Sequence, residues 1–347
     1  MRACVLHAVG DLRFEEVPLP VPGEGEVRVR VGACGVCGSD LPRVFTKGTY
    51  HFPTIPGHEF AGVVDAVGDD VDESLVGRVA AVFPLIPCRS CKMCAAEEFA
   101  LCENYDYLGS RSDGAFAEWV CAPMWNLALA PEGLSVDQAA MTEPAAVALH
   151  ALKRGGIRSG DRVVVFGAGP IGALCALWAK YLGAAAVGVV DIDEAKLRRM
   201  RGLGFQDVCN GRDRDAVAWV ADEFGGAADL VIEATGVAPG VESCLRSARS
   251  RGRVVFLGNP AGDMALAQDA YWEILRRELD VAGTWNSRFT SSSDDDWHET
   301  LRAMASGQFD LSGLVSHRVS LDALPGMMES IRDGLVNACK VLVVNES

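Results

Sequence analysis

The sequence predicts an α/β protein of two domains, one of which contains a doubly wound parallel sheet. Its 347 residues are enough for two cores at roughly 150 residues per domain. The first 150 residues are rich in Gly, Pro and short β-branched runs, such as residues 26–31 and 61–67, which is typical of short strands joined by loops. From Asp161 onward, short apolar strands alternate with helical segments. That alternation is the pattern of a parallel sheet covered by helices.

Six strands are expected in this second part, with helices between them. They are residues 162–166, 186–190, 207–209, 229–233, 253–257 and 279–282. The glycine-rich segment 154–161 is the expected hinge in front of them.

After Gly283 the alternation stops. An acidic, capped helix is expected to open within residues 293–299, followed by a strand near 315–319, a helix near 323–333 and a last strand at 340–344. We expect this tail to fold back onto the first domain.

Charge favours a small-molecule partner. The chain carries 32 Lys and Arg against 47 Asp and Glu, a formal net charge of −15. Such a surface repels phosphate backbones and anionic lipid, and no basic patch interrupts it. We therefore expect no nucleic-acid partner and no membrane partner. Because no apolar run has the length of a signal peptide or a membrane span, we expect a cytoplasmic protein.

A dinucleotide-binding motif follows the first strand of the parallel sheet. Gly167, Gly169 and Gly172 give G-x-G-x-x-G at the head of an apolar helix that opens with Pro170 and Ile171. The glycines permit the tight turn, the approach of a pyrophosphate and close packing of helix on strand. An ordinary glycine-rich turn is the alternative interpretation, and the six-strand context argues against it.

Asp191 ends the second strand of this sheet. A carboxylate there accepts hydrogen bonds from both ribose hydroxyls and repels a 2′-phosphate, which favours NAD over NADP. Arg198 and Arg199 keep NADP open, because arginine near this strand end can hold that phosphate.

Four of the twelve cysteines lie within fifteen residues, at C-x2-C-x2-C-x7-C spacing: Cys88, Cys91, Cys94 and Cys102. Four thiolates make a closed tetrahedral zinc site, which is structural because it leaves no position for a substrate. An iron–sulfur cluster is the alternative, but nothing else in the sequence calls for one-electron chemistry. The scattered cysteines are expected in the core, and they are Cys4, Cys34, Cys121, Cys175, Cys209, Cys244 and Cys339.

A second set of possible ligands is dispersed along the first domain: Cys37, His58, Glu59 and Glu143. A thiolate, an imidazole and a carboxylate would leave zinc an open position for a hydroxyl group. Taken singly, each is a weak indication, because a lone Cys or His in apolar sequence is usually a core residue.

Together these motifs resemble the zinc-dependent medium-chain alcohol and polyol dehydrogenases, in order and spacing, from end to end. The resemblance is carried by Cys37-Gly-Ser-Asp40, Gly57-His-Glu59, the four cysteines, the glycine motif and Glu233-Ala-Thr-Gly236. It implies a GroES-like catalytic domain at residues 1–150 and 287–347 with a structural zinc lobe at 85–105, and an NAD-binding Rossmann domain at 151–286. It also implies a homodimer or homotetramer.

The resemblance also assigns roles. Cys37, His58 and Glu143 become ligands of a catalytic zinc, one of two zinc ions per chain, while Glu59 is either a further ligand or a neighbour of the metal. Ser39 becomes the hydroxyl that passes the substrate proton toward solvent. Several polyol dehydrogenases carry a His beyond the position of Asp40, whereas Leu41-Pro-Arg43 follows here, so the outer proton relay is left open.

Within the family, segments such as 37–45, 84–88 and 105–119 resemble enzymes that act on a polyol phosphate. A phosphorylated substrate needs local cations on an acidic protein, and Arg43 and Arg111 lie in loops that can supply them. The alternative interpretation is that Arg43 and Arg111 are ordinary surface arginines, each with a carboxylate partner.

Two other functions are alternatives to a zinc-dependent dehydrogenase. A zinc-free quinone reductase would lack both ligand sets, and a catalytically silent NAD-binding protein would be expected to have lost a ligand or Ser39. The chain retains all of them.

Overall fold

A computed structural model describes residues 1–260, 262–290 and 292–345, and it confirms the mixed α/β class. The chain divides into two compact units, Met1–Glu143 with Arg288–Ser347, and Pro144–Ser287. The first division falls between Glu143 and Pro144, in the first turn of helix α4 (Thr142–Arg154), the same helix that contains the expected boundary at residue 150. Among the described residues, no helix combines the length and the apolar composition needed to cross a membrane.

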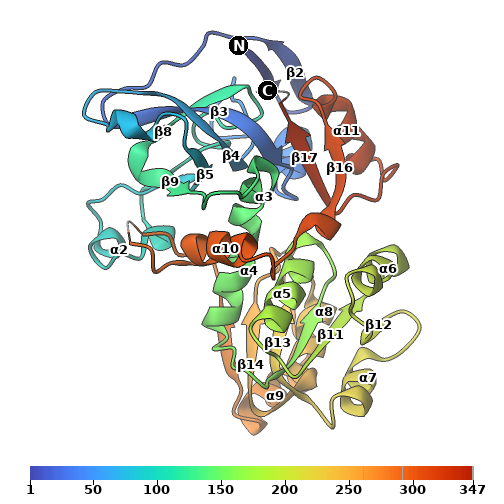
Figure 1. The fold of residues 1–347 in the computed structure, drawn as a ribbon. Coiled ribbons are helices and arrows are strands. Elements are labelled where there is room, and N and C mark those ends of the chain that lie inside the picture. The colour runs from blue at the N-terminus through green and yellow to red at the C-terminus, as the bar shows by residue number, and fades with distance from the viewer. Residues whose placement is uncertain (261, 291, 346–347) are drawn as a thin grey trace. The chain divides into compact units, whose positions relative to one another are not determined.

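The first unit is built on a seven-stranded sheet in the order β16-β17-β3-β4-β5-β9, with β8 also paired to β3. The tail contributes β17, which pairs antiparallel with β3 so that Leu342 lies opposite Gly35. Figure 1 shows this as a red strand beside a blue one. The strands are β3 (Glu26–Gly35), β4 (Glu59–Val67), β5 (Val79–Val82), β8 (Trp119–Pro123), β9 (Leu127–Leu129), β16 (Val315–Val319) and β17 (Lys340–Val344).

Two small antiparallel pairs and several short helices complete this unit. The pairs are β1 (Arg2–Ala8) with β2 (Asp11–Glu16), and β6 (Leu85–Ile86) with β7 (Asp106–Tyr107). The helices are α1 (Asp40–Pro42), a π-helical turn (Arg43–Lys47), α2 (Lys92–Ala95), α3 (Val136–Ala140), α10 (Asp296–Ala305) and α11 (Leu324–Arg332). The acidic helix α10 begins at Asp296, within the expected residues 293–299, and Asp295 caps it by accepting the His298 N–H.

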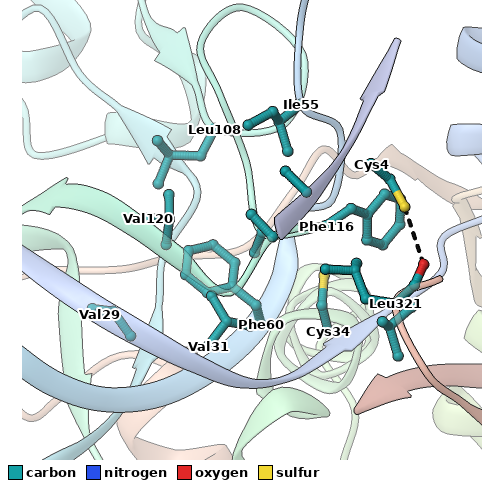
Figure 2. Close-up of a cluster of buried hydrophobic side chains, with 14 of the residues drawn as sticks. Cys4, Val29, Val31, Cys34, Ile55, Phe60, Leu108, Phe116, Val120 and Leu321 are labelled. Carbon is teal, nitrogen blue, oxygen red and sulfur yellow. Dashed lines mark hydrogen bonds between the residues drawn. The ribbon is translucent and has the colours of Figure 1, made fainter. Parts of the chain in front are cut away.

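The core of this unit joins the two ends of the chain. Phe60 and Phe116 fill it, and the Cys4 thiol donates to the Leu321 carbonyl at 3.1 Å, so the first strand is bonded to the tail (Figure 2). Cys4 and Leu321 are both buried. The scattered cysteines lie in apolar surroundings as expected, except for Cys121, which is only half-buried.

The second unit is a six-stranded parallel sheet in the order β12-β11-β10-β13-β14-β15. Strand order reverses between β10 and β13, and ligands of such sheets bind at the carboxyl ends beside that reversal. The strands are β10 (Arg162–Phe166), β11 (Ala186–Asp191), β12 (Val208–Asn210), β13 (Ala228–Glu233), β14 (Ala248–Phe256) and β15 (Asp280–Gly283). The helices that follow α4 are α5 (Pro170–Tyr181), α6 (Glu194–Gly202), α7 (Ala216–Glu223), α8 (Ala238–Ser247) and α9 (Gln268–Arg276).

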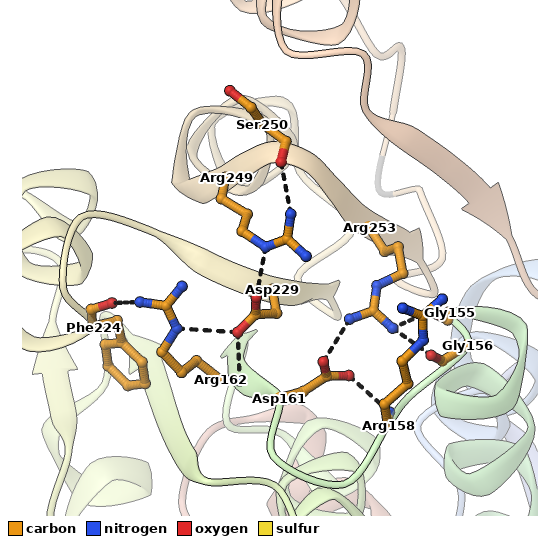
Figure 3. A network of polar contacts seen from close by, with 10 residues as sticks. All are labelled: Gly155, Gly156, Arg158, Asp161, Arg162, Phe224, Asp229, Arg249, Ser250 and Arg253. Atoms are coloured by element: carbon orange, nitrogen blue, oxygen red, sulfur yellow. Dashed lines mark hydrogen bonds and ion pairs between the residues drawn. The ribbon is translucent and has the colours of Figure 1, made fainter.

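A network of arginines and carboxylates fixes the opposite ends of these strands (Figure 3). Asp229 accepts from Arg162 Nε at 3.0 Å and from Arg249 Nε at 2.6 Å. Partial burial opposes ionisation of Asp229, but these hydrogen bonds outweigh it and lower its pKa to about 2. Arg253 pairs with Asp161 at 2.8 Å. The network thus ties β10, β13 and β14 together at their starts and leaves the carboxyl ends free for a ligand.

Candidate functional site

The four-cysteine lobe brings its thiols together. The Sγ atoms of Cys88, Cys91, Cys94 and Cys102 all lie within 4.8 Å of one another. Cys91 and Cys102 are separated by 3.9 Å, far longer than a disulfide. An ion bound to four thiolates at about 2.3 Å would hold neighbouring sulfurs about 3.8 Å apart. The lobe therefore has the donor set and the size of a closed zinc site.

Local hydrogen bonds prepare some of these thiols to lose their protons. Ser90 lowers the pKa of Cys88 to about 6, and the backbone of Glu103 lowers that of Cys91. Cys94 differs, because burial raises its pKa to about 12. A cation at the centre would stabilise all four as thiolates.

The second ligand set forms where strands β3 and β4 meet. Gly35 and Glu59 are paired across the two strands, so Cys37, just after β3, and His58, just before β4, reach the same end of the sheet. Ligand atoms of Cys37, His58 and Glu59 lie within 4.8 Å of one another. Residues far apart in sequence thus form one compact group.

Asp40 orients this group, and the sequence did not assign it that role. Its buried carboxylate accepts the Cys37 N–H at 3.0 Å and lies 3.4 Å from His58 Nδ1. Burial lowers the pKa of His58, but Asp40 and Cys37 oppose this effect and together raise it well above its ordinary value. A carboxylate behind an imidazole is the usual arrangement for a metal-binding histidine.

Arg43 is held by the same carboxylate. Its Nη1 donates to Asp40 Oδ1 at 2.9 Å and lies 3.3 Å from His58 Nδ1. The charge of Arg43 is therefore already balanced by Asp40, and a phosphate would have to compete for it.

Glu59 has one engaged oxygen and one free oxygen. Lys340 Nζ donates to Glu59 Oε2 at 2.5 Å and to the Val36 carbonyl at 3.2 Å, and both charged side chains are buried. Glu59 Oε1 is buried and has no hydrogen-bond partner among the described residues. Gly35 is required beside this pair, because a Cβ there would collide with the Glu59 carboxylate.

Glu143 lies near this group without being part of its tight cluster. It occupies the first turn of α4 and is buried. Burial, with the nearby charge of Glu59, raises the pKa of Glu143 to about 7. Glu59 and Glu143 are both buried and each disfavours ionisation of the other, so a cation in addition to Lys340 would stabilise them as carboxylates.

These residues fit a zinc ion. The donors are a thiol, an imidazole and a carboxylate, which together suit zinc, and Glu59 Oε1 is a buried polar atom that lacks a partner. Ser39 is half-buried beside them, and its N–H donates to Cys37 Sγ at 3.5 Å. Among the described residues, the Ser39 hydroxyl has no hydrogen-bond partner, which leaves it available to a bound molecule.

Arg111 is held between two aromatic rings. Its guanidinium carbon lies 4.3 Å from the ring centres of both Tyr50 and Tyr105, and Nη2 donates to the Tyr50 hydroxyl at 3.2 Å. No carboxylate among the described residues pairs with it. Arg111 is thus an oriented cation without a counter-ion.

In the second unit, the glycine motif adopts the geometry of a pyrophosphate loop. Gly167 has φ +101°, which favours glycine, and Gly169 caps helix α5, where Pro170 is the first residue and Ile171 follows. A Cβ on Gly172 would collide with the Gly167 carbonyl. The helix N-terminus is therefore open to an anion.

Asp191 is bonded to this loop. Its Oδ2 accepts the Ala168 N–H at 2.7 Å and its Oδ1 accepts the Asp193 N–H at 2.9 Å. Lys196 Nζ is 3.7 Å from the same carboxylate. The carboxylate lies at the carboxyl end of β11, where the sequence predicted it.

Glu233 accepts backbone hydrogen bonds at the end of β13, as Asp191 does at the end of β11, a role that we did not expect from the sequence. Its Oε1 accepts the Thr235 N–H at 2.7 Å and the Gly236 N–H at 2.9 Å. The Ala234 carbonyl of this turn lies where a Cβ on Gly167 would be, so the two loops pack closely. The indication in the sequence was the position of Glu233 at the end of an expected strand, directly before Ala234-Thr235-Gly236.

Comparison with known proteins agrees with both units. Residues 23–132 match the alcohol dehydrogenase GroES-like domain, and residues 170–306 match the zinc-binding dehydrogenase family. The galactitol 1-phosphate 5-dehydrogenase of Escherichia coli K12 is 32% identical over 99% of this chain and 100% of its own length. The sorbitol dehydrogenase of Bombyx mori is 30% identical over 98% and 97%.

Solved structures are similar over the whole chain. Galactitol-1-phosphate dehydrogenase from Escherichia coli superposes with a TM-score of 0.94 at 31% identity, covering 99% of this chain and all of that one. A zinc-binding dehydrogenase from Sinorhizobium meliloti 1021, bound to NADP, gives 0.91 at 31% over 99% of each chain. An Escherichia coli CFT073 alcohol dehydrogenase complexed with NADH gives 0.89 at 26% over 99% of each.

Proposed function

The chain belongs to the zinc-dependent alcohol and polyol dehydrogenases, and from that premise we propose that it oxidises a secondary alcohol of a polyol or polyol phosphate to a ketone with NAD. The observation that carries this proposal is the compact set Cys37, His58 and Glu59, with Glu59 Oε1 lacking a partner. A silent NAD-binding protein would have no need of such a set.

We assign two zinc ions per chain. Cys88, Cys91, Cys94 and Cys102 would hold the structural ion. Cys37, His58 and Glu143 would hold the catalytic ion, and Glu59, whose Oε1 lacks a partner among the described residues, would be a further ligand. When bound, that ion supplies Lewis-acid stabilisation of negative charge on the substrate oxygen.

The remaining steps belong to side chains of this protein. Asp40 fixes the orientation of His58, and Lys340 restrains Glu59 through one oxygen. Ser39 takes the proton of the reacting hydroxyl and passes it toward solvent, a role supported by its free hydroxyl next to Cys37. The glycine motif and Asp191 would hold the dinucleotide, whose nicotinamide would supply the acceptor for the carbinol hydride.

NAD is the proposed cofactor because of Asp191. It lies at the carboxyl end of β11, and its negative charge opposes a 2′-phosphate. Lys196, Arg198 and Arg199 are the cations through which NADP would bind instead. The Sinorhizobium relative is bound to NADP.

The substrate we propose is galactitol 1-phosphate, oxidised to tagatose 6-phosphate, with Arg111 as the main phosphate contact and Arg43 in a lesser role. The Escherichia coli relative named for that substrate and the unpaired cation at Arg111 support this choice. An unphosphorylated polyol, cyclitol or secondary alcohol is the second candidate. The sorbitol dehydrogenase relative and the engagement of Arg43 by Asp40 favour it.

We further propose a cytoplasmic homo-oligomer, either a dimer or a tetramer. Helix α9 exposes Tyr271, Trp272 and Leu275, and β15 is the edge strand of its sheet. Exposed aromatic residues beside an open strand edge suit burial against another copy.

A panel of polyols and their phosphates, assayed by NADH absorbance, tests the proposal. We expect turnover of polyols, with the highest kcat/KM for galactitol 1-phosphate. Equal turnover of unphosphorylated sorbitol or galactitol would favour the second candidate, and no turnover of any secondary alcohol by the zinc-loaded enzyme would contradict the proposed reaction.

A further inference from the structure

Tyr107 lies next to His58, one of the proposed zinc ligands. It is the last residue of β7, which pairs with β6. Its ring centre lies 5.7 Å from that of His58, with the two planes inclined by 60°. The Tyr105 ring meets it edge-on at 6.2 Å. The ring is thus fixed in position by its neighbours on two sides.

The phenol end of Tyr107 lies among the charged groups of the site. It interacts electrostatically with Glu143, Arg43, Cys37 and Glu59. These four residues belong to separate segments of the first unit, and they converge around the predicted metal position. The hydroxyl is therefore in the region where the reacting part of a substrate must bind.

The Tyr107 hydroxyl does not take part in the hydrogen bonds of the described residues. Within the part of the chain that the structure describes, the side chain of Tyr107 has ring contacts and electrostatic neighbours but no hydrogen bond. Its oxygen is not one of the fully enclosed polar atoms without partners, so it is open to a bound molecule. A phenol carries its proton at neutral pH, so it can donate a hydrogen bond.

We propose that the Tyr107 hydroxyl donates a hydrogen bond to a second oxygen of the substrate, on a carbon next to the one that is oxidised. Tyr107 is then a residue that selects polyols over simple secondary alcohols. This inference rests on the proposed function and adds to it the group that recognises the neighbouring oxygen. A site built to bond a substrate hydroxyl discriminates against the analogue that lacks it.

The test compares two substrates that differ by one hydroxyl, 2,3-butanediol and 2-butanol, in wild type and Tyr107→Phe. The substitution retains the ring against His58 and removes only the donor. We expect kcat/KM for the diol to fall roughly five- to tenfold, and that for 2-butanol to change by less than about twofold. The matched control is Tyr181→Phe in the other unit, which should alter neither value.

A binding measurement makes the test independent of turnover. Quenching of NADH fluorescence in the enzyme–NADH complex gives Kd for each alcohol, and zinc content is measured on the same samples. We expect Tyr107→Phe to weaken binding of the diol by a similar factor while zinc content stays unchanged. Loss of zinc, or equal loss for both alcohols, would mean that Tyr107 only supports His58 and would overturn the proposal.

The same measurements distinguish an error in the role of Tyr107 from an error in the proposed polyol function. If wild type prefers the diol and Tyr107→Phe retains that preference, the role of Tyr107 is wrong and the proposed polyol function stands. If wild type itself binds and oxidises the diol no better than 2-butanol, the polyol function is wrong and the role of Tyr107 is wrong with it.

Discussion

Lys340 and Glu59 form a buried ion pair, with Nζ 2.5 Å from Oε2 and side-chain exposures of 2% and 1%. Glu59 raises the pKa of Lys340 even though burial alone would lower it. The pair connects the last strand of the chain to the end of β4, where the proposed ligands converge. The tail of the protein therefore contributes a residue, Lys340, to the proposed zinc site.

Breaking this pair should destabilise the protein. Lys340→Met leaves Glu59 buried without its cation, and the loss of one partner of a buried pair costs about 3 to 5 kcal/mol. Urea unfolding checks the value. The double variant Lys340→Met with Glu59→Gln should recover a large part of the loss, and a double variant as unstable as the single one would contradict the account.

The four-cysteine lobe should depend on its metal for local order. Cys91→Ser removes one thiolate from a closed site, so we expect loss of one zinc ion per chain and faster proteolysis within residues 85–105. Elemental analysis and limited proteolysis provide the measurements. Cys121→Ser, a half-buried cysteine outside the lobe, is the control, and its zinc content should equal that of wild type.

Asp191 should set cofactor preference. Asp191→Ser removes the charge that opposes a 2′-phosphate, while Lys196 remains nearby as a cation. We expect the ratio of kcat/KM for NAD to that for NADP to fall at least about tenfold. An unchanged ratio, or a wild type that already prefers NADP, would show that Asp191 does not decide the cofactor.

Arg111 should matter for phosphorylated substrates alone. Charge-assisted bonds to phosphate are worth roughly 1.5 to 3 kcal/mol, so Arg111→Ala should lower kcat/KM for galactitol 1-phosphate at least about tenfold. Unphosphorylated polyols should hardly be affected. Arg43→Ala serves as the comparison, and because Arg43 is bonded to Asp40, we expect it to reduce kcat with both kinds of substrate.

Asp229 should contribute stability that depends on pH. Its folded-state pKa of about 2 lies below its ordinary value, so the stabilisation is complete above about pH 4 and is lost as pH falls toward 2. Asp229→Asn should therefore cost roughly 1 to 2 kcal/mol near pH 7, and the gap to wild type should narrow in acid. Urea unfolding of both proteins across this range measures the gap, and a gap that stays constant would contradict the assignment.

The sequence predicted the parallel sheet well because its strands are local apolar runs. Strand β10 covers the residues expected, whereas β14 begins at Ala248, well before Arg253. That early part pairs with the start of β13 across an irregularity in register, where Ala248 faces Ala228. Charged residues such as Arg249 and Arg251 interrupt the apolar pattern there, so periodicity could not reveal it.

From the sequence, only those residues of the site that are typical metal ligands could be predicted. Cys37 and His58 stand in short motifs, but Asp40, Lys340 and Tyr107 acquire their roles through contacts between distant segments. Lys340 reaches Glu59 because β17 pairs with β3, a relationship that no local pattern encodes. Arg43 differs in part, because its partner Asp40 is only three residues away, whereas its contact with His58 joins two separate segments.

The proposed catalytic metal site is tested by measuring zinc content together with activity in Cys37→Ser. We expect this variant to retain the structural zinc, to bind NADH like wild type, to contain one zinc per chain instead of two, and not to oxidise polyols. A variant that loses both ions, or one that loses none and still turns over polyols, would contradict the assignment of Cys37, His58 and the two glutamates to a catalytic metal site.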